Sequence, residues 1–164
     1  MGPPCCGKTS LLNSILKPWV LEVERTPRGS IYTRLSEWDG VLIGGFDRTA
    51  KHGTAITKQY ALDVLQTCGA ATVFAEGTYL DEDFAKAAVA EGFQVYAYWI
   101  EISAKTTKIR SGGGAPKPYL DQLPTMEATR DAVNARWIDG EQPFELVEAD
   151  LLTAWLADLA PHAL

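Results

Sequence analysis

The sequence has few residues that bind metals or form disulfides, and it has no long apolar run. Its three cysteines are an odd number, and Cys5 and Cys6 are neighbours, so a disulfide framework is not expected. The two histidines, His52 and His162, are far apart and no Cys-x-x-Cys pair occurs, which argues against a zinc site. No apolar stretch approaches the roughly 20 residues of a membrane-spanning helix, and the N-terminus lacks the pattern of a signal peptide. These absences favour a cytoplasmic protein without a membrane segment.

Basic charge is also scarce. Fifteen Lys and Arg stand against 21 Asp and Glu, which gives a net charge of −6. This balance excludes a protein that coats nucleic acid through a general basic field, but it leaves room for one local basic cleft. The 164 residues are 46% hydrophobic and 22% charged, which predicts one globular domain over 1–164. The oligomeric state cannot be read from these features.

The most specific motif lies at the start of the chain, where residues 2–9 match G-x-x-x-x-G-K-[ST]. In such a loop, the glycines let backbone N–H groups turn toward an anion. Lys8 would reach the β- and γ-phosphates of ATP, and Thr9 would place its hydroxyl on Mg²⁺. Apolar residues at 11, 12, 15 and 16 predict an amphipathic helix, limited by Pro18, whose N-terminus favours phosphate. The predicted nucleotide-binding residues are Gly2, Pro3, Pro4, Cys5, Cys6, Gly7, Lys8, Thr9 and Ser10. The alternative is a Gly/Pro-rich turn that binds nothing.

A phosphate loop normally follows a strand, and here only Met1 precedes the motif. We expect either that residues before Met1 supply a central strand or that the sheet tolerates a gap there.

Elsewhere, apolar runs alternate with helical patterns, which predicts an α/β fold with a mostly parallel sheet. Asp39-Gly40 between two β-prone runs predicts a hairpin within 30–46. Further strands are expected at 71–75, 95–102 and 144–148, with helices at 54–68, 81–90, 103–110, 124–138 and after 148. Thr54 and Asp81 are the expected N-caps of two of these helices.

Three acids are expected at or just beyond strand ends, where ligands bind in parallel sheets: Asp47, Glu76 and Asp150. Glu76, after an apolar strand, is the first candidate for a carboxylate that holds Mg²⁺ together with Thr9 or accepts a proton from an attacking hydroxyl. Asp47 is the second candidate for the proton acceptor. Each could instead be an ordinary solvated acid beside a turn.

Cations for the transferring phosphoryl group are expected near the end of the helix at 103–110. Arg110 is the candidate, followed by a segment at 111–123 that would form a mobile lid, with Arg110 and Lys117 flanking its glycines. The alternatives are a surface helix end and a linker-like segment. Of Arg130 and Arg136, at most one is expected to face the same cleft.

Aromatic side chains could grip a nucleobase. Tyr32, Trp38 and Phe46 are better placed for this role than Tyr96, Tyr98 and Trp99, which are expected in core and strand surface.

With these motifs in place, the chain resembles small P-loop kinases of the nucleoside and nucleotide kinase type. Within that group it looks most like phage-type kinases thought to act on hydroxymethylated pyrimidines in DNA. The matching segments are the loop at 2–9, Gly45-Phe46-Asp47, Gly53-Thr54 and Glu76-Gly77. The sequence departs from the pattern at Ala55, where the family carries an acid, and at Thr78-Tyr79. The resemblance implies a three-layer P-loop fold, here lacking its first, central strand.

Three hypotheses follow. The first is an ATP-dependent kinase that phosphorylates a hydroxyl of a small molecule or nucleotide, including a modified base in DNA reached through a local cleft. The second is an ATP-hydrolysing or nucleotide-switched binding protein with no acceptor but water. The third is an inactive or truncated remnant of a P-loop protein.

Overall fold

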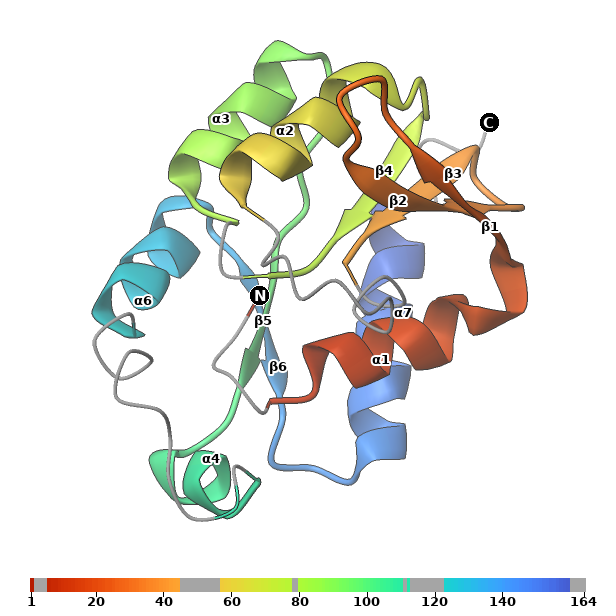
Figure 1. The fold of residues 1–164 in the computed structure, drawn as a ribbon. Helices are drawn as coiled ribbons and strands as arrows, with labels where there is room; N and C mark the ends of the chain where they lie inside the picture. The colour runs from red at the N-terminus through yellow and green to blue at the C-terminus, as the bar shows by residue number, and fades with distance from the viewer. Residues whose placement is uncertain (2–5, 45–56, 78–79, 111, 113–122, 160–164) are drawn as a thin grey trace. The chain divides into compact units, whose positions relative to one another are not determined.

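The computed structural model describes residues 1, 6–44, 57–77, 80–110, 112 and 123–159. They fall into two compact units: a terminal unit, Met1–Leu11 with Tyr96–Leu164, and a middle unit, Leu12–Val95. Each unit has its own sheet and its own helices (Figure 1). The α/β class predicted from the sequence is therefore confirmed.

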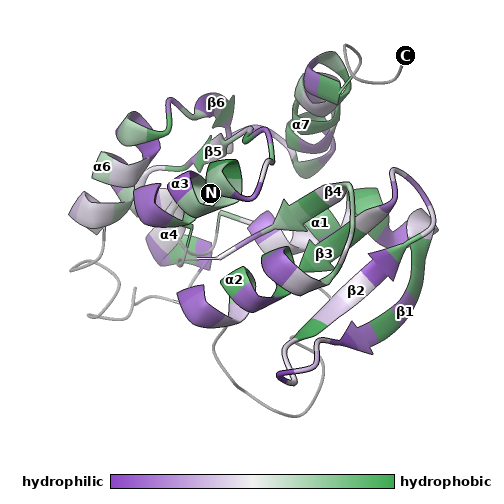
Figure 2. Ribbon diagram, turned by 90° about the horizontal axis from the view of Figure 1, so that it is seen from above, coloured by the Kyte–Doolittle hydropathy of each residue, from purple (hydrophilic) through white to green (hydrophobic). Residues whose placement is uncertain are grey.

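The middle unit is built on a mixed four-stranded sheet. Its strands, in spatial order, are β1 (Val20–Arg25), β2 (Ile31–Leu35), β3 (Gly40–Ile43) and β4 (Thr72–Ala75). The pairs β1–β2 and β2–β3 are antiparallel, and only β3–β4 is parallel. Figure 2 shows β3 and β4 as largely hydrophobic, in keeping with their sequences GVLI and TVFA. Because these two strands are parallel, the residues that follow them meet at one edge of the sheet.

Two helices, α2 (Lys58–Thr67) and α3 (Glu82–Ala90), lie on one face of this sheet (Figure 1). Thr57 caps α2 and Asp81 caps α3, each accepting a hydrogen bond from a backbone N–H three residues later. The cap at Asp81 was predicted, whereas Thr54 lies outside the described residues. The core between helices and sheet consists of Tyr32, Val41, Ile43, Ala61, Val64, Leu65, Cys68, Ala70, Phe84 and Ala88.

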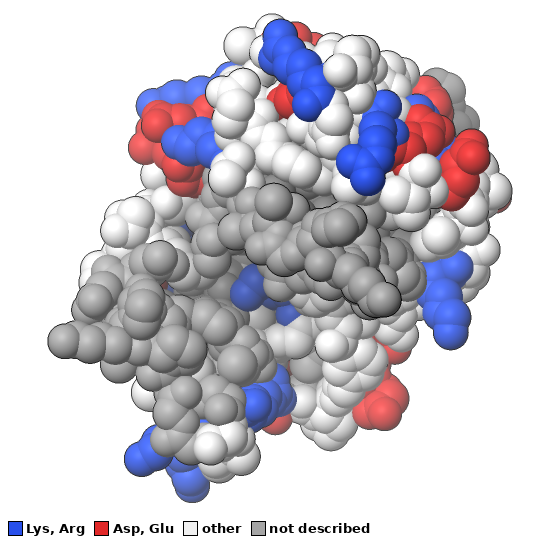
Figure 3. Space-filling model, viewed as in Figure 1, with Lys and Arg blue, Asp and Glu red and all other residues white. Residues whose placement is uncertain are grey.

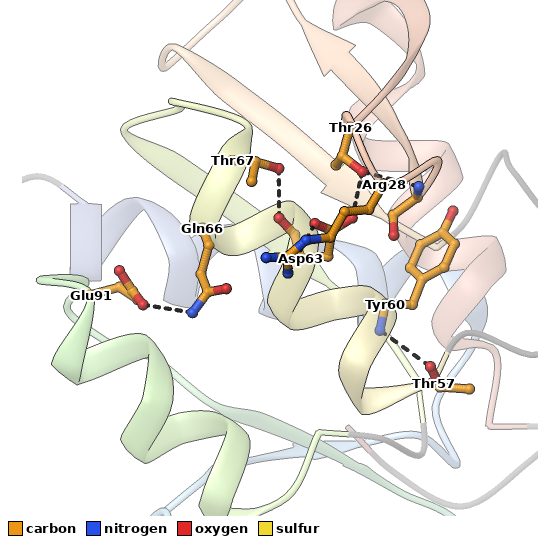
Figure 4. Close-up of polar contacts among 9 residues, drawn as sticks. Thr26, Arg28, Thr57, Tyr60, Asp63, Gln66, Thr67 and Glu91 are labelled. Carbon is orange, nitrogen blue, oxygen red and sulfur yellow. Dashed lines mark hydrogen bonds and ion pairs between the residues drawn. The ribbon is translucent and has the colours of Figure 1, made fainter.

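A buried carboxylate ties the β1–β2 loop to α2. Asp63, on α2, is only 2% exposed and accepts a hydrogen bond from the hydroxyl of Thr26 (Figure 4). The guanidinium of Arg28 lies 3.7 Å from the same carboxylate. Burial raises the pKa of Asp63, but hydrogen bonds from Ser30 and Thr26 and the charge of Arg28 outweigh it, and the pKa lies below its ordinary value.

The hairpin predicted around Asp39 is present between β2 and β3, with its turn one residue earlier than expected. Trp38 and Asp39 take the positive φ angles, 59° and 45°, and Gly40 already belongs to β3. Trp38 packs edge-on against Trp19 and Phe74, with ring centroids 4.7 and 5.7 Å away. Trp38 therefore packs across the sheet, and its binding of a base stays a prediction.

The terminal unit holds a parallel pair, β5 (Tyr98–Glu101) and β6 (Arg136–Asp139), with α4 (Ala104–Arg110), α6 (Leu123–Ala132) and α7 (Phe144–Leu159). Successive strand residues point to opposite faces. Trp99 and Trp137 are paired in register, and Arg130 of α6 lies over both rings, at 5.4 and 4.6 Å. On the other face, Tyr98 and Arg136 both bind Asp158 of α7. Helices α6 and α7 therefore cover opposite faces of this sheet.

Met1 lies along β5 in the manner of a residue in a neighbouring parallel strand. Its amino nitrogen donates to the carbonyl oxygen of Tyr98 at 2.6 Å, and its carbonyl oxygen accepts from the N–H of Ile100 at 3.0 Å. In a parallel ladder, one residue bonds to the two neighbours of the residue that faces it. Here Met1 faces Trp99 and bonds to Tyr98 and Ile100. The segment that enters the phosphate loop is therefore held on β5.

The helix predicted after the phosphate loop is α1 (Lys8–Leu16), followed by the 3-10 turn Lys17–Trp19 that contains Pro18. The predicted apolar stripe of α1, Leu11, Leu12, Ile15 and Leu16, is buried. The boundary between the two units falls within this helix.

Two predicted elements near the C-terminus are wrong. The segment 144–148 is the first part of α7 rather than a strand, because the helix starts directly after Pro143, whose carbonyl oxygen accepts from the N–H of Leu146. The predicted helix at 124–138 ends at Ala132, and its last residues are strand β6. The prediction of one mostly parallel sheet is also wrong: the described strands form a mixed four-stranded sheet, in which only β3–β4 is parallel, and a separate parallel pair, β5–β6. Among the helices of the described residues, none is both long and apolar enough to cross a membrane.

Candidate functional site

The start of α1 has the geometry of an anion-binding helix N-terminus. Gly7 precedes the helix with a φ of 95°, a conformation that glycine adopts without steric cost. Its carbonyl oxygen accepts the N–H of Leu11 at 2.9 Å, so the helical ladder begins there. The first turn is Lys8, Thr9 and Ser10, and the N–H groups of a first turn point away from the helix. As at any helix N-terminus, these N–H groups have no acceptor within the helix, which is the feature that anion binding uses.

Lys8 is folded back over the loop. Its Nζ lies 3.6 Å from the Sγ of Cys6, which is only 3% exposed. A thiol sulfur is a weak acceptor, and a phosphate oxygen is a much stronger one for an ammonium group. Residues 2–5, which include the predicted positions Gly2 and Cys5, lie outside the described residues.

Arg110 reaches the phosphate loop from the end of α4. Its Nη1 lies 3.5 Å from the carbonyl oxygen of Cys6, and its Nη2 donates to the carbonyl oxygen of Gly140 at 3.2 Å. All three residues belong to the terminal unit. The structure therefore brings together two parts of the site that were predicted separately, the loop and its cation.

Glu76 lies at the carboxyl end of β4, as predicted, in the middle unit. It is 2% exposed, and its N–H donates to the carbonyl oxygen of Ile43 at 3.2 Å. Gly44 follows β3 at the same edge with a φ of 98°, and a Cβ on Gly44 would lie 3.1 Å from Cγ and Oε1 of Glu76. The absent side chain at 44 therefore leaves the space that the buried carboxylate fills.

The other predicted acids have different outcomes. Asp47 lies outside the described residues. Asp150 does not follow a strand, because it lies within α7 and accepts a hydrogen bond from Gln142 at 3.2 Å. The acids that do stand at the ends of β5 and β6 are Glu101 and Asp139.

The remaining basic and aromatic candidates are engaged elsewhere. Arg130 stacks on tryptophan rings and pairs with Asp131 at 2.7 Å, and Arg136 binds Asp158. Tyr32 donates to Glu24, so it is held within the middle unit's sheet. Phe46 and the predicted lid lie outside the described residues, apart from Gly112 and Leu123.

Oxygen donors suited to Mg²⁺ are present at the predicted positions, in the hydroxyl of Thr9 and the carboxylate of Glu76. Within the described part of the chain, no three His, Cys, Asp or Glu residues form a cluster that could hold a metal by themselves. Thr9 lies in the terminal unit and Glu76 in the middle unit, so the two donors are described separately. The Thr9 hydroxyl suits an ion that takes its other ligands from a bound phosphate.

The sequence predicts that a helix ends at Asp139-Gly140, but the element that ends there is strand β6. Asp139, Gly140 and Glu141 join the end of β6 to both ends of α4. No sequence signal indicates these contacts of Glu141 with α4.

No family model, curated protein or solved structure matches the chain. The case for a function therefore rests on its own residues.

Proposed function

We propose that this protein is an ATP-dependent kinase of the P-loop type, which transfers the γ-phosphoryl group to a hydroxyl of a small molecule or nucleotide. The observation that carries the proposal is the approach of Arg110 to the carbonyl of Cys6, at the start of a helix whose first residues are Lys8 and Thr9. A cation from a distant helix beside a phosphate-binding motif is what stabilisation of a transferring phosphoryl group requires.

The first turn of α1 would hold the phosphates of ATP through its backbone N–H groups and its dipole. Lys8 would move from the sulfur of Cys6 to the β- and γ-phosphates, a short rotation of a flexible side chain. The hydroxyl of Thr9 would hold Mg²⁺, and the ion when bound neutralises charge on these phosphates.

Arg110 would bind the charge that develops during transfer. Its guanidinium presents several N–H donors in a fixed plane, so it can keep a contact with the loop and still bind a phosphoryl oxygen. The acceptor's hydroxyl oxygen forms the new bond to phosphorus, the bond to the bridging oxygen breaks, and ADP leaves. The hydroxyl proton passes to a carboxylate, for which Glu76 and Asp47 are the candidates.

The acceptor fits a small molecule or a nucleotide better than the general surface of a nucleic acid. On the face seen in Figure 3, the described Lys and Arg residues are interspersed with Asp and Glu. A DNA acceptor carrying a modified base would therefore contact a local cleft, in agreement with the net charge of −6.

The test is transfer of label from γ-labelled ATP to nucleosides, nucleotides and DNA that contains hydroxymethylated pyrimidines. The proposal predicts a labelled product that is lost in Lys8→Ala. If free phosphate is released instead, and adding acceptors does not change the rate of release, an ATP-hydrolysing protein is favoured. Neither transfer nor release would favour an inactive remnant.

A further inference from the structure

The turn between β6 and α7 holds α4 at both of its ends. At the N-terminal end, the carboxylate of Glu141 accepts the N–H of Ser103 through Oε1 and the hydroxyl of Thr106 through Oε2, the latter at 2.6 Å. At the C-terminal end, Arg110 donates to the carbonyl oxygen of the preceding residue, Gly140, at 3.2 Å. Two consecutive residues therefore hold a seven-residue helix.

The turn itself is fixed to the sheet. The N–H of Glu141 donates to Oδ1 of Asp139 at 3.0 Å, and the N–H of Gly140 donates to the carbonyl oxygen of Glu101 at 2.8 Å. A Cβ on Gly140 would lie 2.7 Å from that carbonyl oxygen and 2.7 Å from a methyl group of Ile102. No side chain fits there, so the turn has one position relative to β5.

The Glu141 carboxylate is ionised under the conditions in which a kinase works. The hydroxyl of Thr106 and the N–H of Ser103 donate to it and hold its pKa below the ordinary value. A negative charge at the N-terminus of α4 also interacts favourably with the positive end of the helix dipole. Both effects favour α4 in the orientation that directs Arg110 toward Cys6.

We propose that Glu141 is a positioning residue that holds α4 so that Arg110 reaches the phosphate loop. The effect of Glu141 on phosphate binding rests on the proposed function, since Arg110 acts on phosphate only if the loop binds it. The restraint of the Arg110 side chain by Glu141 does not depend on any ligand. The two parts therefore call for two readouts.

The first readout is the order of the Arg110 side chain in the unliganded protein, measured by nuclear magnetic resonance relaxation of arginine Nε with the Arg110 signal assigned from Arg110→Lys. Glu141→Ala is expected to mobilise Arg110, and Glu141→Gln, which keeps one carbonyl acceptor, is expected to restore part of the order. Glu145→Gln, on an exposed position of α7, is the matched control and should change nothing. An Arg110 signal as ordered in Glu141→Ala as in the wild type would overturn the inference, whether or not the protein binds ATP.

The second readout is a double-mutant cycle on the binding of Mg·ATP and of inorganic tripolyphosphate. Glu141→Ala alone should weaken binding roughly tenfold, the effect of losing one charge-assisted contact. In the Arg110→Ala background the same change should have no further effect, because Glu141 acts through Arg110. An undiminished loss in that background would show a general structural role and would contradict the inference. Restraint of Arg110 in a protein that binds neither probe would instead refute the proposed function alone.

Discussion

The guanidinium of Arg110 lies 3.5 Å from the carbonyl oxygen of Cys6, although 104 residues separate the two in the sequence. Cys6 is the second residue before Lys8, and Arg110 is the last residue of α4. The carbonyl of Cys6 accepts from the guanidinium, and in the proposed kinase the same planar group would also bind a phosphoryl oxygen. A lysine could not make both contacts in one plane.

Arg110→Ala is therefore expected to lower the rate of phosphoryl transfer by on the order of a thousandfold, the effect of an arginine that stabilises transition-state charge. Arg110→Lys should recover only a small part of this rate, because it keeps the charge without the planar donors. The measurement is the single-turnover rate with saturating ATP. Lys105→Ala, which removes an exposed cation from the same helix, is the control. Equal rates for Arg110→Ala and Lys105→Ala would show that Arg110 does not act in catalysis.

Gly44→Ala tests the close packing around Glu76. A methyl group at 44 would meet the Glu76 side chain at 3.1 Å and would also take a φ of 98°. Gly29→Ala is the matched control, since Gly29 has a φ of 90° with nothing within 4 Å of its Cβ position. Both variants should lose about 1–2 kcal/mol of stability from the left-handed backbone.

Gly44→Ala alone should lose more stability than this backbone effect explains, because the added methyl group displaces the Glu76 carboxylate. For the same reason it should also lose phosphoryl transfer. Urea unfolding and transfer rates, each compared between the two variants, make this measurement. If both variants keep the same activity, the position of the Glu76 carboxylate is not important for the reaction.

Asp63 gives the middle unit a pH-dependent contribution to stability. Its pKa in the folded protein is lowered, so the folded state binds this proton less readily than the unfolded chain. The stabilisation is therefore present above the unfolded pKa, near 4, and is lost as the pH falls through the folded value. Asp63→Asn should cost about 1–3 kcal/mol at pH 7, because a buried carboxylate that accepts hydrogen bonds loses its charge.

The difference in unfolding free energy between wild type and Asp63→Asn should shrink as the pH falls below about 4. Urea unfolding of the middle unit at pH 7 and pH 3 measures it, with Glu22→Gln as a control at an exposed strand position. A difference that stays constant with pH would mean that the Asp63 charge does not contribute.

Several helices and strands were predictable because local chemistry specifies them. The apolar stripe of α1, the Asp81 cap and the apolar run of β4 each depend on neighbouring residues, and all three are present. The strand β1, VLEVER, was not predicted although half of its residues are apolar, and at this sheet edge both Leu21 and Val23 are 60% exposed.

The errors in the last third of the chain arise from competing patterns. Phe144-Glu-Leu-Val-Glu alternates like a strand, but Pro143 and the apolar residues up to Trp155 continue it as a helix. The break at Asp139-Gly140 is in the predicted place, but it follows a strand rather than a helix. The contacts of Arg110 and Glu141 depend on tertiary packing between segments about 30 or more residues apart, and no local pattern encodes them.

The central claim is that the loop at the start of α1 binds a nucleoside triphosphate through Lys8. The most direct measurement is the thermal unfolding of wild type, Lys8→Ala and Lys17→Ala with and without Mg·ATP, since Lys17 is an exposed cation just beyond the same helix. At a concentration 100 times the dissociation constant, ATP should stabilise wild type and Lys17→Ala by about 2.7 kcal/mol. Lys8→Ala should gain little under the same conditions. Equal stabilisation of all three proteins, or of none, would contradict the account.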